Sequence, residues 1–326
     1  MLRRAVAILC GLLDRVLCHS QAAPLPQPPV FSAGRRVHIP TVQHATLPPD
    51  PQRLRTIVVG DVHGCLDELQ ELLSVCDYNP QTTRVVLVGD LVNKGPKSAE
   101  CVRFVREKGF ACVRGNHDDA ALFAWERRQA ERRDGGSPFS QIEDKYAYVD
   151  QFDDADVQFL REMPHTLRLP ELEAIVVHAG LVPGVPLEAQ EAAAMITMRN
   201  LLRPQSKAAD VTTANLKAPQ QWSHKAKQGV GWATAWAPDD ATLANVSCVI
   251  FGHDAKRGLQ QEAFATGLDT GACYGKKLTA LVLERHKDDS IPPEEYGGSG
   301  VKGGVAVARR IVSVRSARVY SEPGSK

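Results

Sequence analysis

The stretch RTIVVGDVHG, residues 55–64, joins an apolar run to a polar turn bracketed by glycines. The run TIVVG (56–60) is short and rich in β-branched residues, which is typical of a buried strand. The turn places Asp61 and His63, two metal-ligating residue types, two positions apart. Taken alone, this stretch fits an ordinary turn as well as it fits one corner of a metal site. The partners of a metal site must therefore come from elsewhere in the chain.

Strand and helix patterns alternate twice more after this stretch. Buried strands are predicted over 84–89 and 110–115, and amphipathic helices over 65–76 and 97–109. A third helix is predicted to begin at His117. Strand–helix–strand units at this spacing predict right-handed crossovers and a largely parallel stretch of sheet.

Four further strands are predicted in the second half of the chain. They cover 173–180, 246–254, 277–284 and 305–315, and no helical pattern separates the last two. The fold class is therefore α/β, and the pattern favours a mixed sheet or a two-sheet sandwich flanked by helices. We expect one folded domain over 54–320.

The rest of the chain is predicted to be leader, linker and insertions. Residues 1–23 are expected to be a targeting segment and residues 24–53, which are rich in proline, a linker. Within the domain, 181–245 is predicted to be an insert or cap that carries the tryptophans, and 287–304 a mobile loop rich in glycine and proline.

The leader has Arg3 and Arg4 before an apolar run over 5–13 and then small residues, which is typical of a signal peptide. The run is too short to span a bilayer. The arginines also fit a mitochondrial presequence. The third alternative is a hydrophobic N-terminal segment that has no targeting function. We expect the secretory or vacuolar route first, the mitochondrion second and the cytoplasm third.

Composition excludes several classes of protein. The 326-residue chain is 43% apolar and 24% charged, as ordinary globular proteins are, and its net charge is +1. Such a balance gives no general attraction to nucleic acid or to an anionic membrane, so we expect no stable nucleic-acid binding. The eight cysteines form no C-x-x-C pair, which argues against a zinc finger, and their scatter argues against a disulfide framework.

A polar cluster follows each strand predicted for the parallel part of the fold and two of the later strands. The clusters contain Asp61, His63, Asp90, Asn116, His117, Asp118, His178 and His253. Because the carboxyl ends of parallel strands meet along one crevice, we expect these side chains to lie close together. The joint pattern is much harder to explain as coincidence than any one of its members.

The residue types suit two divalent cations. Asp61, His63 and Asp90 can hold one of them. The second can be held by Asp90, Asn116, His178 and His253. A shared carboxylate can bridge two metals about 3.5–4 Å apart. Mixed nitrogen and oxygen ligands without thiolate favour Mn, Fe, Zn or Co over Mg or Ca.

Five short motifs resemble those of the calcineurin-like metallophosphoesterases in the phosphoprotein phosphatase superfamily. They are GDVHG, GDLVNKG, GNHD, VHAG and GHD, spread over residues 56 to about 285. Within that superfamily the chain is most similar to the ApaH-like phosphatases. The resemblance implies a β-sandwich flanked by α-helices, with a di-metal site at the carboxyl ends of the strands.

The resemblance also implies roles for single residues. It implies the two ligand sets given above and makes His117 the general acid. Asn93 and Lys94 stand where the Ser/Thr phosphatases have Asp and Arg. The residue expected to orient His117 is therefore uncharged. The residue expected to bind phosphate is a lysine, which offers a single compact charge where arginine offers two parallel donors. Further phosphate contacts are expected from Arg114, Arg199, Lys256 or Arg257, and Arg199 is the favoured one.

The implied activity is metal-dependent hydrolysis of phosphate esters or anhydrides. ApaH-like relatives cleave phosphoanhydrides: dinucleoside polyphosphates, polyphosphate or the bridge of capped RNA. The departures at Asn93 and Lys94 favour that reading over a Ser/Thr phosphoprotein phosphatase, which stays as the alternative. A non-catalytic, metal-bearing scaffold is the remote alternative, and we expect a monomer.

Overall fold

A computed structural model describes residues 30–31, 35–36, 42–133, 144–202, 221–238, 243–286 and 306–324. The chain divides into two units, Met1–Arg36 and Val37–Lys326. In the first unit, β1 (Val30–Phe31) pairs antiparallel with β2 (Arg35–Arg36). The predicted targeting segment and the predicted mobile loop over 287–304 lie outside the described residues.

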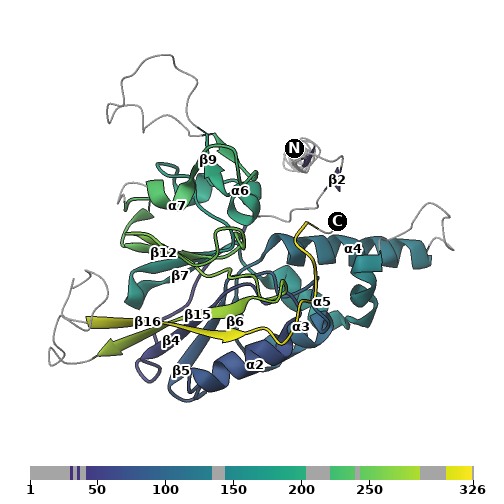
Figure 1. Cartoon of the computed structure of the whole chain (residues 1–326), viewed down its shortest axis with the longest axis horizontal. Helices are drawn as coiled ribbons and strands as arrows, with labels where there is room; N and C mark the ends of the chain where they lie inside the picture. The colour runs from purple at the N-terminus through teal and green to yellow at the C-terminus, as the bar shows by residue number, and fades with distance from the viewer. Residues whose placement is uncertain are drawn as a thin grey trace, which may run out of the picture. The chain divides into compact units, whose positions relative to one another are not determined.

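The second unit contains a five-stranded sheet in the order β16-β15-β4-β5-β6. Strands β4 (Arg55–Val59), β5 (Thr83–Leu87) and β6 (Ala111–Cys112) are parallel, as their crossover helices require. The long strands β15 (Lys277–His286) and β16 (Ala306–Arg315) extend the sheet antiparallel (Figure 1). All five strands were predicted from the sequence.

A six-stranded sheet has the order β13-β14-β12-β8-β7-β3. The central strands β8 (Ala174–Val177), β12 (Cys248–Phe251) and β14 (Ala265–Gly267) are parallel, and β7 (Thr166–Leu169) and β13 (Gln260–Gln261) run antiparallel to their neighbours. Only β8 and β12 were predicted.

Strand β3 (His44–Thr46) pairs with β7 at the edge of this sheet. It lies within the segment predicted to be a linker over 24–53, so at residues 44–46 the structure differs from that prediction. The strand is three residues long and its partner lies 122 residues further along the chain, so no local periodicity marks it.

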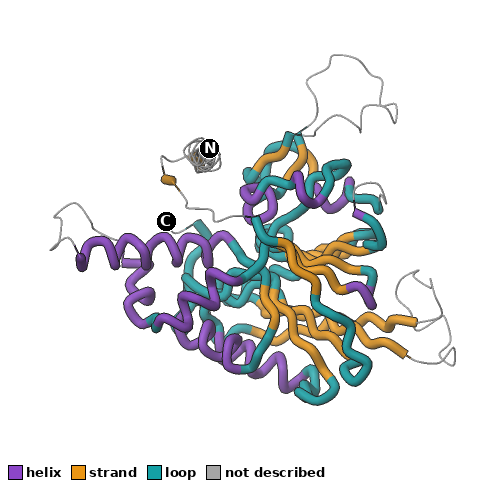
Figure 2. The backbone as a smooth tube through the Cα atoms, turned by 180° about the vertical axis from the view of Figure 1, so that it is seen from behind, coloured by secondary structure: helices purple, strands orange, loops and turns teal. Residues whose placement is uncertain are grey.

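Helices cover both outer faces of the pair of sheets. Helices α2 (Leu66–Val75), α3 (Ser98–Glu107), α4 (Asn116–Arg133) and α5 (Asp154–Glu162) and the 3-10 helix η1 (Asp144–Gln151) lie on the side of the five-stranded sheet (Figure 2). Short 3-10 helices η2 (Pro170–Leu172) and η3 (Leu187–Ala189) connect the later elements. None of the described helices is long and apolar enough to cross a membrane.

The described parts of the predicted insert lie beside the six-stranded sheet. They form α6 (Ala192–Thr197), α7 (Trp232–Ala235) and a small sheet of β9 (Asn200–Leu201), β10 (Trp222–Ser223) and β11 (Val230–Gly231). Trp232 is buried and packs on Phe251 of β12, with ring centroids 4.7 Å apart. This tryptophan is therefore part of the core that fixes the insert to the sheet.

Alternation along the strands explains the layers. In β4, Ile57 and Val59 pack against the helices, whereas Val58 joins the core between the two sheets. In β12, Ile250 joins that inner core, whereas Val249 and Phe251 pack against the insert. Side chains that alternate in a strand point to opposite faces, so strands that are apolar at every position are buried on both faces.

Candidate metal centre

The loops at the carboxyl ends of the parallel strands bring the predicted ligands together. Among the residues that the structure describes, two groups have their ligand atoms within 4.8 Å of one another. The first group consists of His63, Asp90 and His117, and the second of Asp90, His178 and His253. Asp90 is common to both groups, as expected for a carboxylate shared by two metal ions. His117, which was predicted to be the general acid, lies close enough to be counted with the first group.

Hydrogen bonds orient the three predicted histidine ligands. The Nδ1 atoms of His63 and His178 lie 3.0 and 2.8 Å from the carbonyl oxygens of Val92 and Val88, to which they donate. The Nε2 atom of each ring therefore carries no proton and keeps its lone pair for a metal. Each Nε2 lies 3.5 Å from Oδ2 of Asp90. A backbone carbonyl that fixes the tautomer in this way is the usual outer partner of a metal-ligating histidine.

His253 is held the other way round. Its Nε2 lies 3.1 Å from the carbonyl oxygen of Thr197, and its backbone N–H donates to both carboxylate oxygens of Asp61 at 3.1 Å. The lone pair of Nδ1 is therefore the one available to a metal. Asp61 belongs to neither compact group. Asn116 lies at the edge of the centre, with Oδ1 3.2 Å from Nε2 of His178.

Electrostatics of the buried groups fit a site for divalent cations. Burial lowers the pKa of His178 to about 4 and the pKa values of His63 and His253 well below their usual range, so these imidazoles are neutral at pH 7. Burial raises the pKa of Asp90 to about 7 and that of Asp61 well above its usual range. A bound cation would favour the charged carboxylates, so this donor set fits a metal.

Two glycines make room for the carboxylates. A Cβ at Gly115 would lie 2.1 Å from Oδ1 of Asp90, and one at Gly252 would lie 2.0 Å from Oδ1 of Asp61. Strain is also concentrated here, because five described residues of the site have a positive φ: His63, Asp90, Asn93, Lys94 and His253. Strained backbone of this kind clusters at functional sites.

Asn93 and Lys94 lie beside the two histidines of the first group. The backbone N–H of Lys94 donates to Oδ1 of Asn93 at 2.8 Å, and Nδ2 of Asn93 lies 3.0 Å from Nδ1 of His117. Nζ of Lys94 lies 2.8 Å from Nε2 of His63 and 5.3 Å from the centre of the Tyr274 ring. A cationic side chain, predicted to contact phosphate, therefore lies beside the first ligand group.

Arg199 lies next to the second group. Its guanidinium donates to the carbonyl oxygens of His224 and His253 at 2.9 and 3.0 Å and lies 3.7 Å from Asp254. Its side chain is 25% exposed, so a phosphate can reach it. Lys256 and Arg257 are exposed, and Arg257 pairs with Asp254.

Arg114 is a correction to the sequence analysis. Its side chain is completely buried, donates to the carbonyl oxygen of Arg161 at 2.5 Å and lies 3.6 Å from Asp119. The position follows β6 closely, as a phosphate-binding residue could. The side chain is nevertheless directed into the packing between α4 and α5, where substrate cannot reach it.

Two buried acids were given no role in the sequence analysis. Asp118 is fully buried, and its carboxylate accepts three backbone N–H groups. Asp269 is 4% exposed. Burial is the largest cause of the raised pKa of Asp61, and the charge of Asp269 raises that pKa further. The signal for Asp269 was present in GLDTG, where an acid follows the end of a short strand by two residues, but the strand itself was not predicted.

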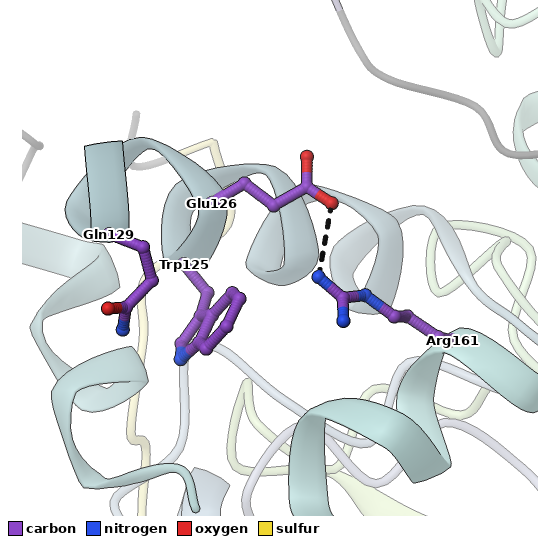
Figure 3. A pocket seen from close by; sticks show the side chains of 4 residues that line it. All are labelled: Trp125, Glu126, Gln129 and Arg161. Atoms are coloured by element: carbon purple, nitrogen blue, oxygen red, sulfur yellow. Dashed lines mark ion pairs between the residues drawn. The ribbon is translucent and has the colours of Figure 1, made fainter. Parts of the chain in front are cut away.

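A cavity of about 490 Å³ lies between α4 and α5 (Figure 3). It is lined by Trp125, Glu126, Gln129 and Arg161. The Arg161 guanidinium lies 5.2 Å from the centre of the Trp125 ring and 3.5 Å from Glu126, so the charge of Arg161 is already paired within the lining. Trp125 follows His117 by eight residues, or about 12 Å of helix, so the cavity is separate from the metal centre.

Comparison with known proteins agrees with this geometry. Residues 54–257 match the family model of the calcineurin-like phosphoesterases. The chain belongs to that family. It is therefore a metal-dependent phosphoesterase, and the fold and enzyme class predicted from the sequence are confirmed.

The chain is also similar to symmetrical bis(5'-nucleosyl)-tetraphosphatases. The protein from Chromohalobacter salexigens is 29% identical over 71% of this chain and 95% of its own length. The protein from Aromatoleum aromaticum is 30% identical over 69% of this chain and 92% of its own length. A crystal structure assigned to a diadenosine tetraphosphatase superposes with a TM-score of 0.61 at 29% identity, covering 84% of this chain and 98% of its own.

Proposed function

We propose that this phosphoesterase hydrolyses phosphoanhydride bonds of dinucleoside polyphosphates, with two divalent metal ions. The proposal rests above all on the hydrogen bond between Asn93 and His117. Because Oδ1 of Asn93 is occupied by the N–H of Lys94, the group facing His117 is the amide NH₂, which donates. Nδ1 of His117 must then accept, and the ring proton lies on Nε2.

This polarity keeps His117 neutral. An imidazolium would carry a proton on Nδ1, directed at the donating amide of Asn93, so the charged form is disfavoured. Burial and the charge of Lys94 lower the pKa of His117 well below its usual range in the same direction. The neutral ring can donate a hydrogen bond from Nε2 but cannot readily give up a proton.

A neutral histidine that only donates a hydrogen bond suits one class of leaving group. Hydrolysis of an anhydride releases a phosphate oxygen that is stable as an anion, whereas hydrolysis of phosphoserine releases an alkoxide that must be protonated. General acid catalysis contributes roughly 10²–10⁴-fold where the leaving group requires it. The arrangement at His117 therefore supports an anhydride substrate over a phosphoprotein.

Asp61, His63 and Asp90 would hold one metal, and Asp90, Asn116, His178 and His253 the other. When bound, two such ions activate water and neutralise charge on the phosphate oxygens. The three histidines and the absence of thiolate from these proposed ligands favour Mn, Zn, Co or Fe over Mg.

Cationic side chains would hold the remaining phosphates. Lys94 lies beside the first ligand group and Arg199 beside the second, so both could contact a chain of phosphates that extends from the centre. The named activity of the bacterial relatives, which this chain matches over more than nine tenths of their length, supports a dinucleoside tetraphosphate as the substrate.

A substrate panel tests this proposal. Diadenosine tetraphosphate, polyphosphate, capped RNA and a phosphopeptide are compared at equal concentration with Mn²⁺, and kcat/KM is measured for each. We expect the dinucleotide to be cleaved best and the phosphopeptide worst. A phosphopeptide that is cleaved as well as the dinucleotide would refute the anhydride assignment and favour a phosphoprotein phosphatase.

The Asp90→Asn variant is the matched control for that panel. Because one carboxylate serves both ligand groups, we expect activity and both metals to be lost together. Metal content is measured on the purified protein alongside turnover. Retention of two metals per chain would contradict the shared role of Asp90.

A further inference from the structure

Asp118 connects the two loops that carry the metal ligands. Its Oδ2 accepts the backbone N–H groups of Asp90 and Gly115 at 2.8 and 2.9 Å, and its Oδ1 accepts that of Leu91 at 2.9 Å. The side chain is completely buried. We propose that Asp118 is a positioning residue that holds Asp90 in place for both metal ions. This inference rests on the proposed ligand role of Asp90.

The bond from the Gly115 N–H to Asp118 is a common helix-capping contact and would not by itself indicate support of the metal site. Asp118 is the third residue of α4, and an acid there commonly reaches back to the N–H of the residue before the helix. The bonds to Asp90 and Leu91 are different, because those residues lie 28 and 27 positions earlier in the chain, on the loop after β5. Capping of α4 does not require them.

The contact between the loops is reciprocal. The side chain of Asp118 accepts the N–H of Asp90, and the side chain of Asp90 accepts the N–H of His117 at 2.9 Å. The two backbones are also in close contact, because a Cβ at Gly89 would lie 2.6 Å from the backbone nitrogen of Gly115. Two carboxylates therefore link the loops in opposite directions.

Asp90 depends on this support. Its φ is 53°, in the left-handed region that L-residues rarely adopt, so the loop does not favour this conformation unaided. Without the Asp118 carboxylate, the N–H groups of Asp90 and Leu91 would be buried and unpaired. Relaxation of that loop would move the Asp90 carboxylate relative to His63 and His178, which face its Oδ2.

Asp119 provides a matched control on the same helix. It is also completely buried, but its carboxylate lies 3.6 Å from Arg114 rather than on the ligand loops. Asp119→Asn should therefore weaken the fold without moving Asp90. A comparison of the two positions separates support of the metal site from general stability.

The experiment measures Mn²⁺ binding by calorimetry to the metal-free full-length wild type and to Asp118→Ala, Asp118→Asn and Asp119→Asn, with melting temperature recorded for each. Loss of an outer partner of a metal site costs roughly 10–100-fold in affinity. We expect the Kd for Mn²⁺ to rise about 10-fold or more for Asp118→Ala and by a smaller factor for Asp118→Asn, which keeps one acceptor oxygen. Asp119→Asn should stay within about 3-fold of wild type.

Two outcomes would overturn the inference: wild-type affinity in the Asp118 variants, or an equal loss of affinity in Asp119→Asn. If Asp118→Ala does not fold, the comparison of Asp118→Asn with Asp119→Asn decides. Failure of the wild type to bind Mn²⁺ would refute the proposed function, which is a different result from wild-type binding that the variants leave unchanged.

Discussion

The side-chain amide of Asn93 donates to Nδ1 of His117 across 3.0 Å, and the backbone of Lys94 fixes the direction of that bond. An aspartate at position 93 would do the opposite, because a carboxylate accepts and would favour a proton on Nδ1. Asn93 therefore favours a neutral His117, in the same direction as burial and the charge of Lys94.

The double variant Asn93→Asp, Lys94→Arg should shift preference toward phosphomonoesters. The new carboxylate would stabilise an imidazolium at His117, and the arginine could bind a terminal phosphate with two parallel hydrogen bonds. We expect the ratio of kcat/KM for a phosphopeptide to that for diadenosine tetraphosphate to rise at least about tenfold, or roughly 1.4 kcal/mol.

The pH profile of the same variant provides a second readout. Because a carboxylate at position 93 would raise the pKa of His117, the protonated acid would be present below that pKa and lost as the pH rises through it. Phosphopeptide hydrolysis by the variant should therefore decline at high pH. The single variant Lys94→Arg keeps Asn93 and is the control. An unchanged substrate ratio in the double variant would mean that these positions do not set the substrate class.

Removing the ring of His117 should separate acid catalysis from metal binding. His117→Asn should keep both metals, because His63 and Asp90 remain in its group. The Nε2–H of His117 can still donate a hydrogen bond to a leaving oxygen, so turnover should fall more on a phosphomonoester with a poor leaving group, such as phosphoserine, than on an anhydride. The loss on the poor leaving group should reach at most roughly 10²–10⁴-fold. Metal analysis and the two rates check this. Loss of one metal would show that His117 is a ligand, as its place in the first group allows.

A methyl group at Gly252 should disturb the metal centre. The Cβ of Gly252→Ala would lie 2.0 Å from the Asp61 carboxylate, which must then move. We expect Mn²⁺ affinity to fall about tenfold, as calorimetry would show. Gly231→Ala is the control, since its Cβ would come no closer than 3.7 Å to Arg257. Equal Mn²⁺ affinity in the two variants would contradict the role of Asp61.

Two truncations should separate the leader from the fold. Removal of residues 1–41 should leave activity and melting temperature close to wild type. Removal of residues 1–50 also deletes β3 and Gln43, the residue before it. Gln43 bonds to His165 and His44 bonds to Thr166, so the loss should cost a few kcal/mol at about 1 kcal/mol per hydrogen bond. Equal melting temperatures would show that β3 contributes nothing.

The targeting function of the N-terminal segment requires a separate experiment. We propose that the targeting segment over residues 1–23 directs the chain to the secretory or vacuolar route, on the basis of Arg3, Arg4 and the apolar run over 5–13. A fluorescent reporter fused to residues 1–41 should leave the cytosol. A diffuse cytosolic signal would refute a targeting role.

The sequence by itself determined the family, the parallel core and the set of candidate ligands. Strands such as β4 and β5 are local apolar runs, and each is followed by a glycine and an acid, so every part of the pattern lies within a few residues. Parallel strands then bring their carboxyl ends together, which is why Asp61, Asp90 and His253 could be grouped from their positions in the chain alone.

Tertiary structure decided the features that depend on distant partners. Strand β3 exists because β7 pairs with it, and Arg114 is excluded from the site because α5 packs over it. The role of Asp118 rests on N–H groups 27 and 28 residues away. A side chain's partner across the fold is set by packing and not by its neighbours in sequence, so only the folded chain reveals these contacts.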